Sequence, residues 1–253
     1  MRKTWCRLFI IVAAAVLMPG CGKKEDSGRG ASIIEDVIRP HIDNADNGDS
    51  PGYKQEVQSF RLEGFSRNGQ NQWSVQGKFA NIVDPDIFLK SLKGASVSET
   101  MSVRISADGG VYNKDTRSAT LNGNVVVTMA DGGRALMEHA NWDATNEIIT
   151  TDSAIRIEHS GVILEGIGAE VKPQDEWAIV KTDVRMWDEK GRTITCDGPL
   201  EVVYREKKAI LNNNVEIDDP QGKMYADKVI AHFNPETREI ERVEWMGNVK
   251  AVY

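Results

Sequence analysis

From residue 53 to the end of the chain, apolar and polar side chains alternate with a period of two. In residues 101–107 the odd-numbered positions are apolar, whereas the even-numbered ones are Ser or Arg. This period puts alternate side chains on opposite faces of an extended strand. The same pattern, or a short apolar run, occurs in residues 60–63, 73–79, 125–127, 136–142, 154–157, 162–168, 177–180, 184–187, 224–233 and 240–245. The pattern therefore predicts an all-β domain, with no helix of ordinary length after residue 53.

Clusters of Gly, Asp, Asn and Ser separate these runs. They are Asp108–Gly110, Asp131–Gly133, Ser160–Gly161, Glu189–Gly191 and Asp218–Gly222. Such residues favour turns, because Gly and Asn tolerate positive φ and Asp and Asn side chains hydrogen-bond to nearby backbone. Residues 82–98 are less regular, and residues 87–92 fit either a loop or a short strand. Many short strands at near-regular spacing are typical of a sandwich, a barrel or a β-solenoid.

A sequence repeat gives these strands a common unit. Residues 105–125 and 194–215 align from Ile to Val when one residue is inserted. A looser copy spans residues 224–249, and a half copy covers residues 149–152. Each full copy has Ala or Cys before an Asp near its start, and each ends in Asn-Val. Such self-similarity indicates that one structural unit recurs along the chain.

The repeat carries the same two polar residue types at equivalent positions. They are Asp108, Asp152, Asp197 and Asp227, and Asn124, Asn214 and Asn248. We expect the Asp residues to form corners at one height of the sheet and the Asn residues to cap the start of the next strand. The alternative is a ladder of carboxylates for calcium or acid–base chemistry. A calcium loop needs several oxygen ligands close together in one segment, so the corner interpretation is favoured.

A sheet that rolls up from such strands presents one continuous apolar face to its interior. We expect the large residues on this face to line a ligand site: Trp73, Phe79, Met101, Ile105, Val125, Trp142, Ile155, Met186, Phe233 and Trp245. The pattern is compatible with a filled interior or with an open groove. Close packing is the usual state of a protein interior.

Residues 1–20 have the features of a secretory signal peptide. Three basic residues precede an unbroken apolar run over residues 8–18, and Pro19-Gly20-Cys21 follows it. The run is shorter than the roughly 20 residues that a membrane-spanning helix needs. A cysteine directly after such a run resembles the lipobox of bacterial lipoproteins, which implies cleavage before Cys21 and acylation of its thiol. The alternative is an uncleaved membrane anchor in which Cys21 is incidental.

Residues 21–52 are polar and rich in Asp, Asn, Gly and Ser, which predicts a tether between the membrane and the folded domain. Within them, residues 33–38 have helical spacing and fit either a short docking helix or a linker. The folded domain is expected over residues 53–253. A chain of 253 residues is long enough for one large β domain or two ordinary ones.

Composition and charge exclude some classes of function. The chain is 40% hydrophobic and 27% charged, as expected for a globular protein, and its net charge is −7. Such an acidic balance argues against nucleic acid, whose phosphates require a basic surface. Cys6 would leave with the leader and Cys21 would be acylated, so no internal disulfide is expected. Cys196 occupies the repeat position of Ala107 and is expected to be a small buried residue.

The residue types that catalyse reactions or bind metals are not spaced as a catalytic site or a metal site requires. The four histidines are far apart, and neither a Gly-x-Ser-x-Gly elbow nor a phosphate-binding glycine loop is present. We therefore expect no metal, no cofactor and no enzyme activity. Two alternatives stay open: a β-helical polysaccharide enzyme that uses the repeated Asp residues, and a structural module of the cell envelope.

Two stretches, Phe60–Phe65 and Trp73–Ala80, resemble the opening of the LptC family, which are periplasmic components of the lipopolysaccharide exporter. The three full repeat copies resemble the OstA-type repeat that this family shares with its soluble relative LptA. Together the resemblance covers residues 53–253. It implies an open β-jellyroll, made of rolled antiparallel sheets, whose apolar interior holds the acyl chains of lipopolysaccharide without catalysis.

The resemblance also implies partners and a location. Related jellyrolls would stack end to end across the periplasm, and an inner-membrane ABC transporter complex would supply the energy. Residues 249–253 (Val249, Lys250, Ala251, Val252 and Tyr253) are expected to form an edge strand that a partner extends. The anchor departs from the family, whose familiar members keep a transmembrane helix. The family favours the inner membrane, and the sequence is also compatible with the outer one.

Overall fold

The structure is a computed structural model that describes residues 55–65, 71–97, 102–129, 132–143, 145–146, 148–172, 175–234 and 240–253. The leader (1–20), Cys21, the tether (21–52) and Met101 lie outside the described residues. The secretory signal, the lipid anchor and the short helix over residues 33–38 therefore stay predictions.

The described residues form one antiparallel sheet of 15 strands. Its strands are β1 (Gln55–Phe65), β2 (Asn71–Val83), β3 (Asp86–Val97), β4 (Ser102–Asn113), β5 (Ser118–Met129), β6 (Arg134–Asp143), β7 (Ile148–His159), β8 (Val162–Lys172), β9 (Trp177–Asp188), β10 (Thr193–Cys196), β11 (Leu200–Val203), β12 (Lys208–Asp219), β13 (Gly222–Phe233), β14 (Ile240–Met246) and β15 (Lys250–Val252). These ranges contain no α-helix, and a 3-10 turn spans Tyr204–Glu206. The predicted all-β class and the open β-jellyroll are confirmed.

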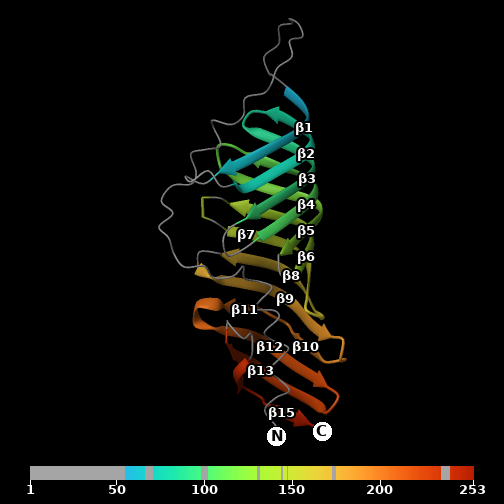
Figure 1. The fold of residues 1–253 in the computed structure, drawn as a ribbon. Coiled ribbons are helices and arrows are strands. Elements are labelled where there is room, and N and C mark those ends of the chain that lie inside the picture. Colours follow the sequence, from blue (N-terminus) through green and yellow to red (C-terminus); the bar gives the residue numbers. More distant parts are fainter. Residues whose placement is uncertain are drawn as a thin grey trace, which may run out of the picture.

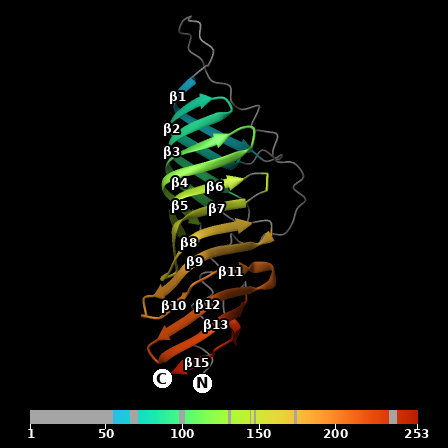
Figure 2. The same ribbon diagram turned by 180° about the vertical axis from the view of Figure 1, so that it is seen from behind.

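From β1 to β10 each strand pairs with its neighbours in the sequence, and with two local exceptions the whole sheet is a continuous meander. Two places in the meander hold two short strands instead of one long one. β10 and β11 both lie between β9 and β12, and β14 and β15 both pair with β13. The strands are stacked along one axis from β1 to β15 (Figure 1), and the view from behind shows the same order (Figure 2).

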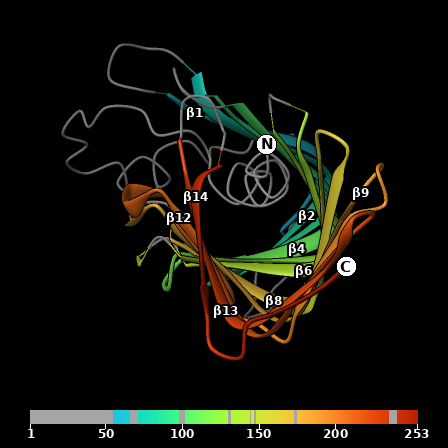
Figure 3. The same cartoon turned by 90° about the horizontal axis from the view of Figure 1, so that it is seen from below.

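Most of the long strands bend near their middle. The register shifts there in the β4–β5, β5–β6, β7–β8 and β12–β13 pairs. Residues with positive φ lie at these shifts, such as Gly123 (73°), Asn124 (47°) and Asn214 (52°). β-Bulges of this kind bend a strand and increase its twist. The bends divide the strands into two arms, and the arms form two walls that curve around a common axis (Figure 3).

Two local predictions differ from the structure. Asp108–Gly110 is not a turn: it lies within β4, and the chain reverses later, at residues 114–117. The residue types that tolerate positive φ serve a mid-strand bulge as well as a turn, so composition alone does not separate the two. Residues 86–97 form the complete strand β3, in which Ser91 has a φ of 54° and interrupts the alternation.

The interior is packed unevenly along the stack. A large buried cluster runs from β7 to β14, and within it Leu200, Leu211 and Val229 are 0% exposed. A smaller cluster between β3 and β6 contains Val125 and Ala107. Full burial of a side chain such as Leu contributes about 1.5–3 kcal/mol. Most of the hydrophobic stabilisation therefore lies toward the β15 end, where the interior is filled.

Candidate functional site

One face of the sheet carries the buried side chains of both walls, and we call it the inner face. Phe60 and Val75 on the first wall pack against the same buried cluster as Leu89 and Leu121 on the second. The cross-strand register connects Val75 through Gly94 to β4 on the first wall, and Leu89 through β4 to Leu121 on the second. The two walls therefore face each other across a shared apolar interior.

Four of the predicted lining residues are buried on the inner face. Val125 and Met186 are 0% exposed, Phe233 is 3% exposed and Ile155 is 5% exposed. Trp245 is partly buried and packs against the large cluster between β7 and β14. In the structure these five side chains fill the interior, so they shape it and leave little free surface of their own.

Two other predicted residues lie on the inner face but keep exposed surface. Ile105 on the first wall is 36% exposed, and Trp142 on the second wall is 44% exposed. Trp142 pairs across the strands with Ile149, which is 41% exposed. We call Ile105, Trp142 and Ile149 the open apolar surface. It spans β4 to β7, where the interior changes from open to filled.

Ile149 was not among the predicted lining residues, although the sequence contained a signal for it. It begins the half copy of the repeat, at the position that Ile105 and Ile194 occupy in the full copies. Equivalent positions of a repeat lie on the same face of a sheet. The signal was hidden because residues 149–152 do not alternate as a longer run.

The remaining predicted lining residues are placed elsewhere. Phe79 pairs with Lys90, and its neighbour Ala80 is buried on the inner face, so Phe79 lies on the opposite, outer face, where it is 39% exposed. Trp73 belongs to β2 and pairs with Gly64 and Ser96 through its backbone. Met101 lies outside the described residues.

The recurring Asp and Asn residues meet at the bends as hydrogen-bonded pairs. The Asn124 amide donates to the Asp108 carboxylate at 2.7 Å, and the Asn248 amide donates to Asp227 at 2.9 Å. The Asn214 amide donates to Asp197 in the same way. The expected corners are thus present, but the Asn side chains bond across to the preceding strand and do not cap the next one.

The fourth repeated acid, Asp152, pairs with His139 of the neighbouring strand β6. This hydrogen bond, together with the charge of the imidazole, holds the pKa of Asp152 below its usual value. Nowhere in the described ranges do three His, Cys, Asp or Glu side chains gather as a metal site would require. The carboxylates of the repeat are therefore engaged in bending the sheet.

Cys196 is buried in the large cluster, as predicted, at 4% exposure. Burial raises the pKa of its thiol to about 11, because the thiolate would lose its hydration. At neutral pH the group is a thiol and acts as a small apolar side chain.

The two ends of the sheet present unpaired strand edges. In the described part of the chain, β1 pairs only with β2, and β14 and β15 pair only with β13. Residues Val249, Val252 and Tyr253 at the β15 end are 53%, 43% and 98% exposed. An unpaired edge offers backbone donors and acceptors to a strand from another chain.

None of the described segments contains a helix that is long and apolar enough to cross a membrane.

Comparison with known proteins finds a family whose model matches this chain. The LptC family model, described as lipopolysaccharide-assembly, LptC-related, matches residues 58–189. One similar solved structure is that of LptH from Pseudomonas aeruginosa, described as the LptA homologous periplasmic component of the conserved lipopolysaccharide transport device. It is 11% identical and covers 60% of this chain and 94% of its own, with a TM-score of 0.25, too low to bear on function. The curated proteins contain no match.

Proposed function

Since this chain belongs to the LptC-related family of lipopolysaccharide-assembly proteins, we propose that it holds the acyl chains of lipopolysaccharide between its two walls and passes them on without catalysis. Membership gives the chain a role in the lipopolysaccharide transport machinery and a periplasmic location. The observation that carries the finer proposal is the open apolar surface of Ile105, Trp142 and Ile149 on the inner face.

The chemistry of the inner face suits an acyl chain. Lipopolysaccharide is anionic and this chain has a net charge of −7, so overall charge attraction does not favour binding. Burial of acyl chains contributes about 0.8 kcal/mol for each CH₂ group. A few methylene groups on the open apolar surface are enough to outweigh a modest repulsion.

The sheet edges suit the bridging role. A related jellyroll would add its terminal strand to β14 and β15 at one end or to β1 at the other, as in other cases of strand addition. Stacked in this way, the inner faces of successive jellyrolls would form one apolar track. An acylated Cys21 would tether the chain to a membrane, and the ABC transporter complex would drive the movement.

Photo-crosslinking tests the acyl-chain site. A photo-reactive amino acid placed at Trp142 or Ile149 in cells should form an adduct with lipopolysaccharide, because both positions keep exposed inner-face surface. The matched control is Asn141, which neighbours Trp142 and is exposed on the outer face, where it bonds to Thr120. Adducts are detected with an antibody against lipopolysaccharide.

Three outcomes are informative. Adducts at 142 and 149 but not at 141 support the proposal. Equal labelling of all three positions, or no labelling at 142 and 149 in protein present at normal levels, contradicts it. Absence of labelling at 142 and 149 would favour a structural module of the cell envelope. The filled interior between β7 and β14 is what such a module would have.

A further inference from the structure

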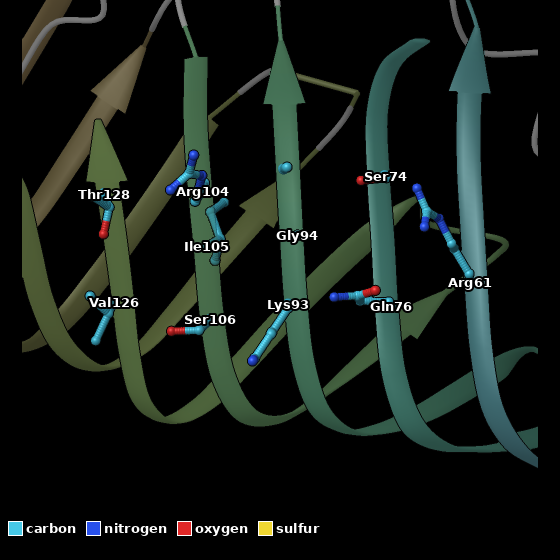
Figure 4. Close-up of a pocket in the computed structure, with 11 residues that line it drawn as sticks. Arg61, Ser74, Gln76, Lys93, Gly94, Arg104, Ile105, Ser106, Val126 and Thr128 are labelled. Carbon is cyan, nitrogen blue, oxygen red and sulfur yellow. The ribbon is translucent and has the colours of Figure 1, made fainter. Parts of the chain in front are cut away.

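The outer face of the first five strands contains a hollow of about 450 Å³. Residues from β1 to β5 line it: polar ones such as Arg61, Gln76, Lys93, Arg104, Ser106 and Thr128 lie beside the apolar Ile105 and Val126 (Figure 4). At about 30 Å³ for each water molecule, the hollow has the volume of about 15 waters. It is large enough for a small polar molecule.

The register places this hollow on the face opposite the acyl-chain surface. Arg61 pairs with Gln76, Gln76 pairs with Lys93, and Lys93 pairs with Ser106, so these four side chains form one row across β1 to β4. The next row runs from Glu63 through Ser74, Ala95 and Arg104 to Thr128. Their sequence neighbours Val75 and Ile105 belong to the inner face, and alternate residues of a strand point to opposite faces.

The described side chains that line the hollow carry a net positive charge, opposite to that of the molecule. Three of its lining residues are cations, and none of the described residues that line it is acidic. The chain as a whole carries a net charge of −7. No carboxylate in the described ranges forms an ion pair with Lys93 or Arg104. Lys93 and Arg104 lie on the neighbouring strands β3 and β4, where they attract an anion and repel each other without it.

The types of side chain favour a phosphate group over a simple anion. A guanidinium presents several donors that match the oxygens of a phosphate, and an ammonium adds a point charge. Ser106, Thr128 and Gln76 add neutral donors at the same level of the sheet. A tetrahedral group with several oxygens uses all of these donors, whereas a chloride ion does not.

We propose that this outer hollow is a binding site for a phosphate-bearing group. Both a phospholipid headgroup and a free phosphate have this chemistry. Apart from Gly94 and Ile105, the residues that line it lie on the face opposite the acyl-chain surface, so its charged donors Lys93 and Arg104 are separate from that surface. It gives the jellyroll a second ligand, bound by charge, next to a first one bound by apolar burial.

The test is a titration of the full chain in a neutral maltoside detergent, followed by calorimetry. The probes are inorganic phosphate and glycerophosphoglycerol, the water-soluble headgroup of phosphatidylglycerol. The double variant Lys93→Gln/Arg104→Gln should bind either probe about tenfold more weakly or worse, since two charge-assisted contacts are lost. Lys93→Arg should retain binding. The matched control is Lys90→Gln, an exposed cation of the same strand outside the hollow, which should change nothing.

Each result decides the question. Saturable binding that the double variant loses, and that weakens with added salt, supports the site; tighter binding of the headgroup identifies lipid as its source, and tighter binding of phosphate identifies the free ion. Absence of binding to both probes overturns the proposal, and so does equal binding by the double variant. Loss of crosslinking at Trp142 would leave this result unaffected, so the two proposals fail separately.

Discussion

Asn214 combines two tasks in one residue. Its φ of 52° lies at the bend of β12, and its amide donates to Asp197 in the connection between β10 and β11. Asn accepts positive φ more readily than most residues because its short polar side chain bonds locally. The same combination occurs at Asn124 and Asn248, so the repeated Asn fixes both the place and the partner of each bend.

Replacement of Asn214 separates these tasks. Asn214→Ala should lower the free energy of unfolding by about 1–3 kcal/mol. The variant loses the hydrogen bond to Asp197, and Ala at positive φ has steric strain that no local side-chain hydrogen bond offsets. Asn214→Gly loses only the hydrogen bond and should cost about 1 kcal/mol. Urea denaturation measures both. Equal losses for the two variants would show that the backbone conformation contributes nothing.

At the residue scale, the sequence predicted what recurs but not what it contacts. The Asp corners followed from the repeat, because equivalent positions in a repeat take equivalent places. The Asp–Asn bonds depend on the register between two strands, which alternation does not specify. The pairing of Asp152 with His139 depends on it even more, since His139 lies outside any repeat copy.

At the scale of elements, the strands differ in how deeply their inner-face side chains are buried. Leu211 in β12 is fully buried, whereas Ile105 in β4 lies on the same inner face with a third of its surface exposed. Strand positions were predictable from the period of two. The length of the strands was not, because the same Asp, Asn and Gly residues that end a strand elsewhere bend it here.

A matched pair of substitutions measures this difference. Leu211→Ala should lower the free energy of unfolding by about 2–5 kcal/mol, since it leaves a cavity in a closely packed cluster. Ile105→Ala removes a similar volume from the open apolar surface and should cost about 1 kcal/mol, because solvent already reaches the site. Thermal or urea denaturation compares them. Equal losses would mean that the interior is as filled at β4 as at β12.

At the scale of the whole molecule, the sheet ends in β1 on one side and in β14 and β15 on the other, and among the described residues each of these strands pairs on one side only. β15 comprises three exposed residues that pair with β13 alone within the described chain. The sequence predicted a terminal strand, but the meander order could not be read from it. Any strand of a period-two pattern can pair with any other, and only the short connections limit the choice.

Deletion of residues 249–253 tests the β15 end. The variant should keep its melting temperature within a few degrees, because these residues are exposed and contribute little burial. It should bind the next jellyroll of the transport machinery about tenfold more weakly, since the backbone template for strand addition is shortened. Binding assays with an immobilised partner measure the change, and a partner that docks at β1 serves as the control. Unchanged affinity would exclude a docking role for β15.

The sequential order of the strands has a mechanical consequence for the folded chain. Because every strand bonds only to strands one or two places away in the sequence, cooperativity passes from one strand to the next along the stack, as in repeat proteins. With the filled interior between β7 and β14, amide hydrogens there should exchange only in rare global openings, while those of β1 to β3 exchange through local fraying. The β1 end of the sheet can therefore open locally to admit a bulky ligand, while the filled interior between β7 and β14 keeps the molecule folded.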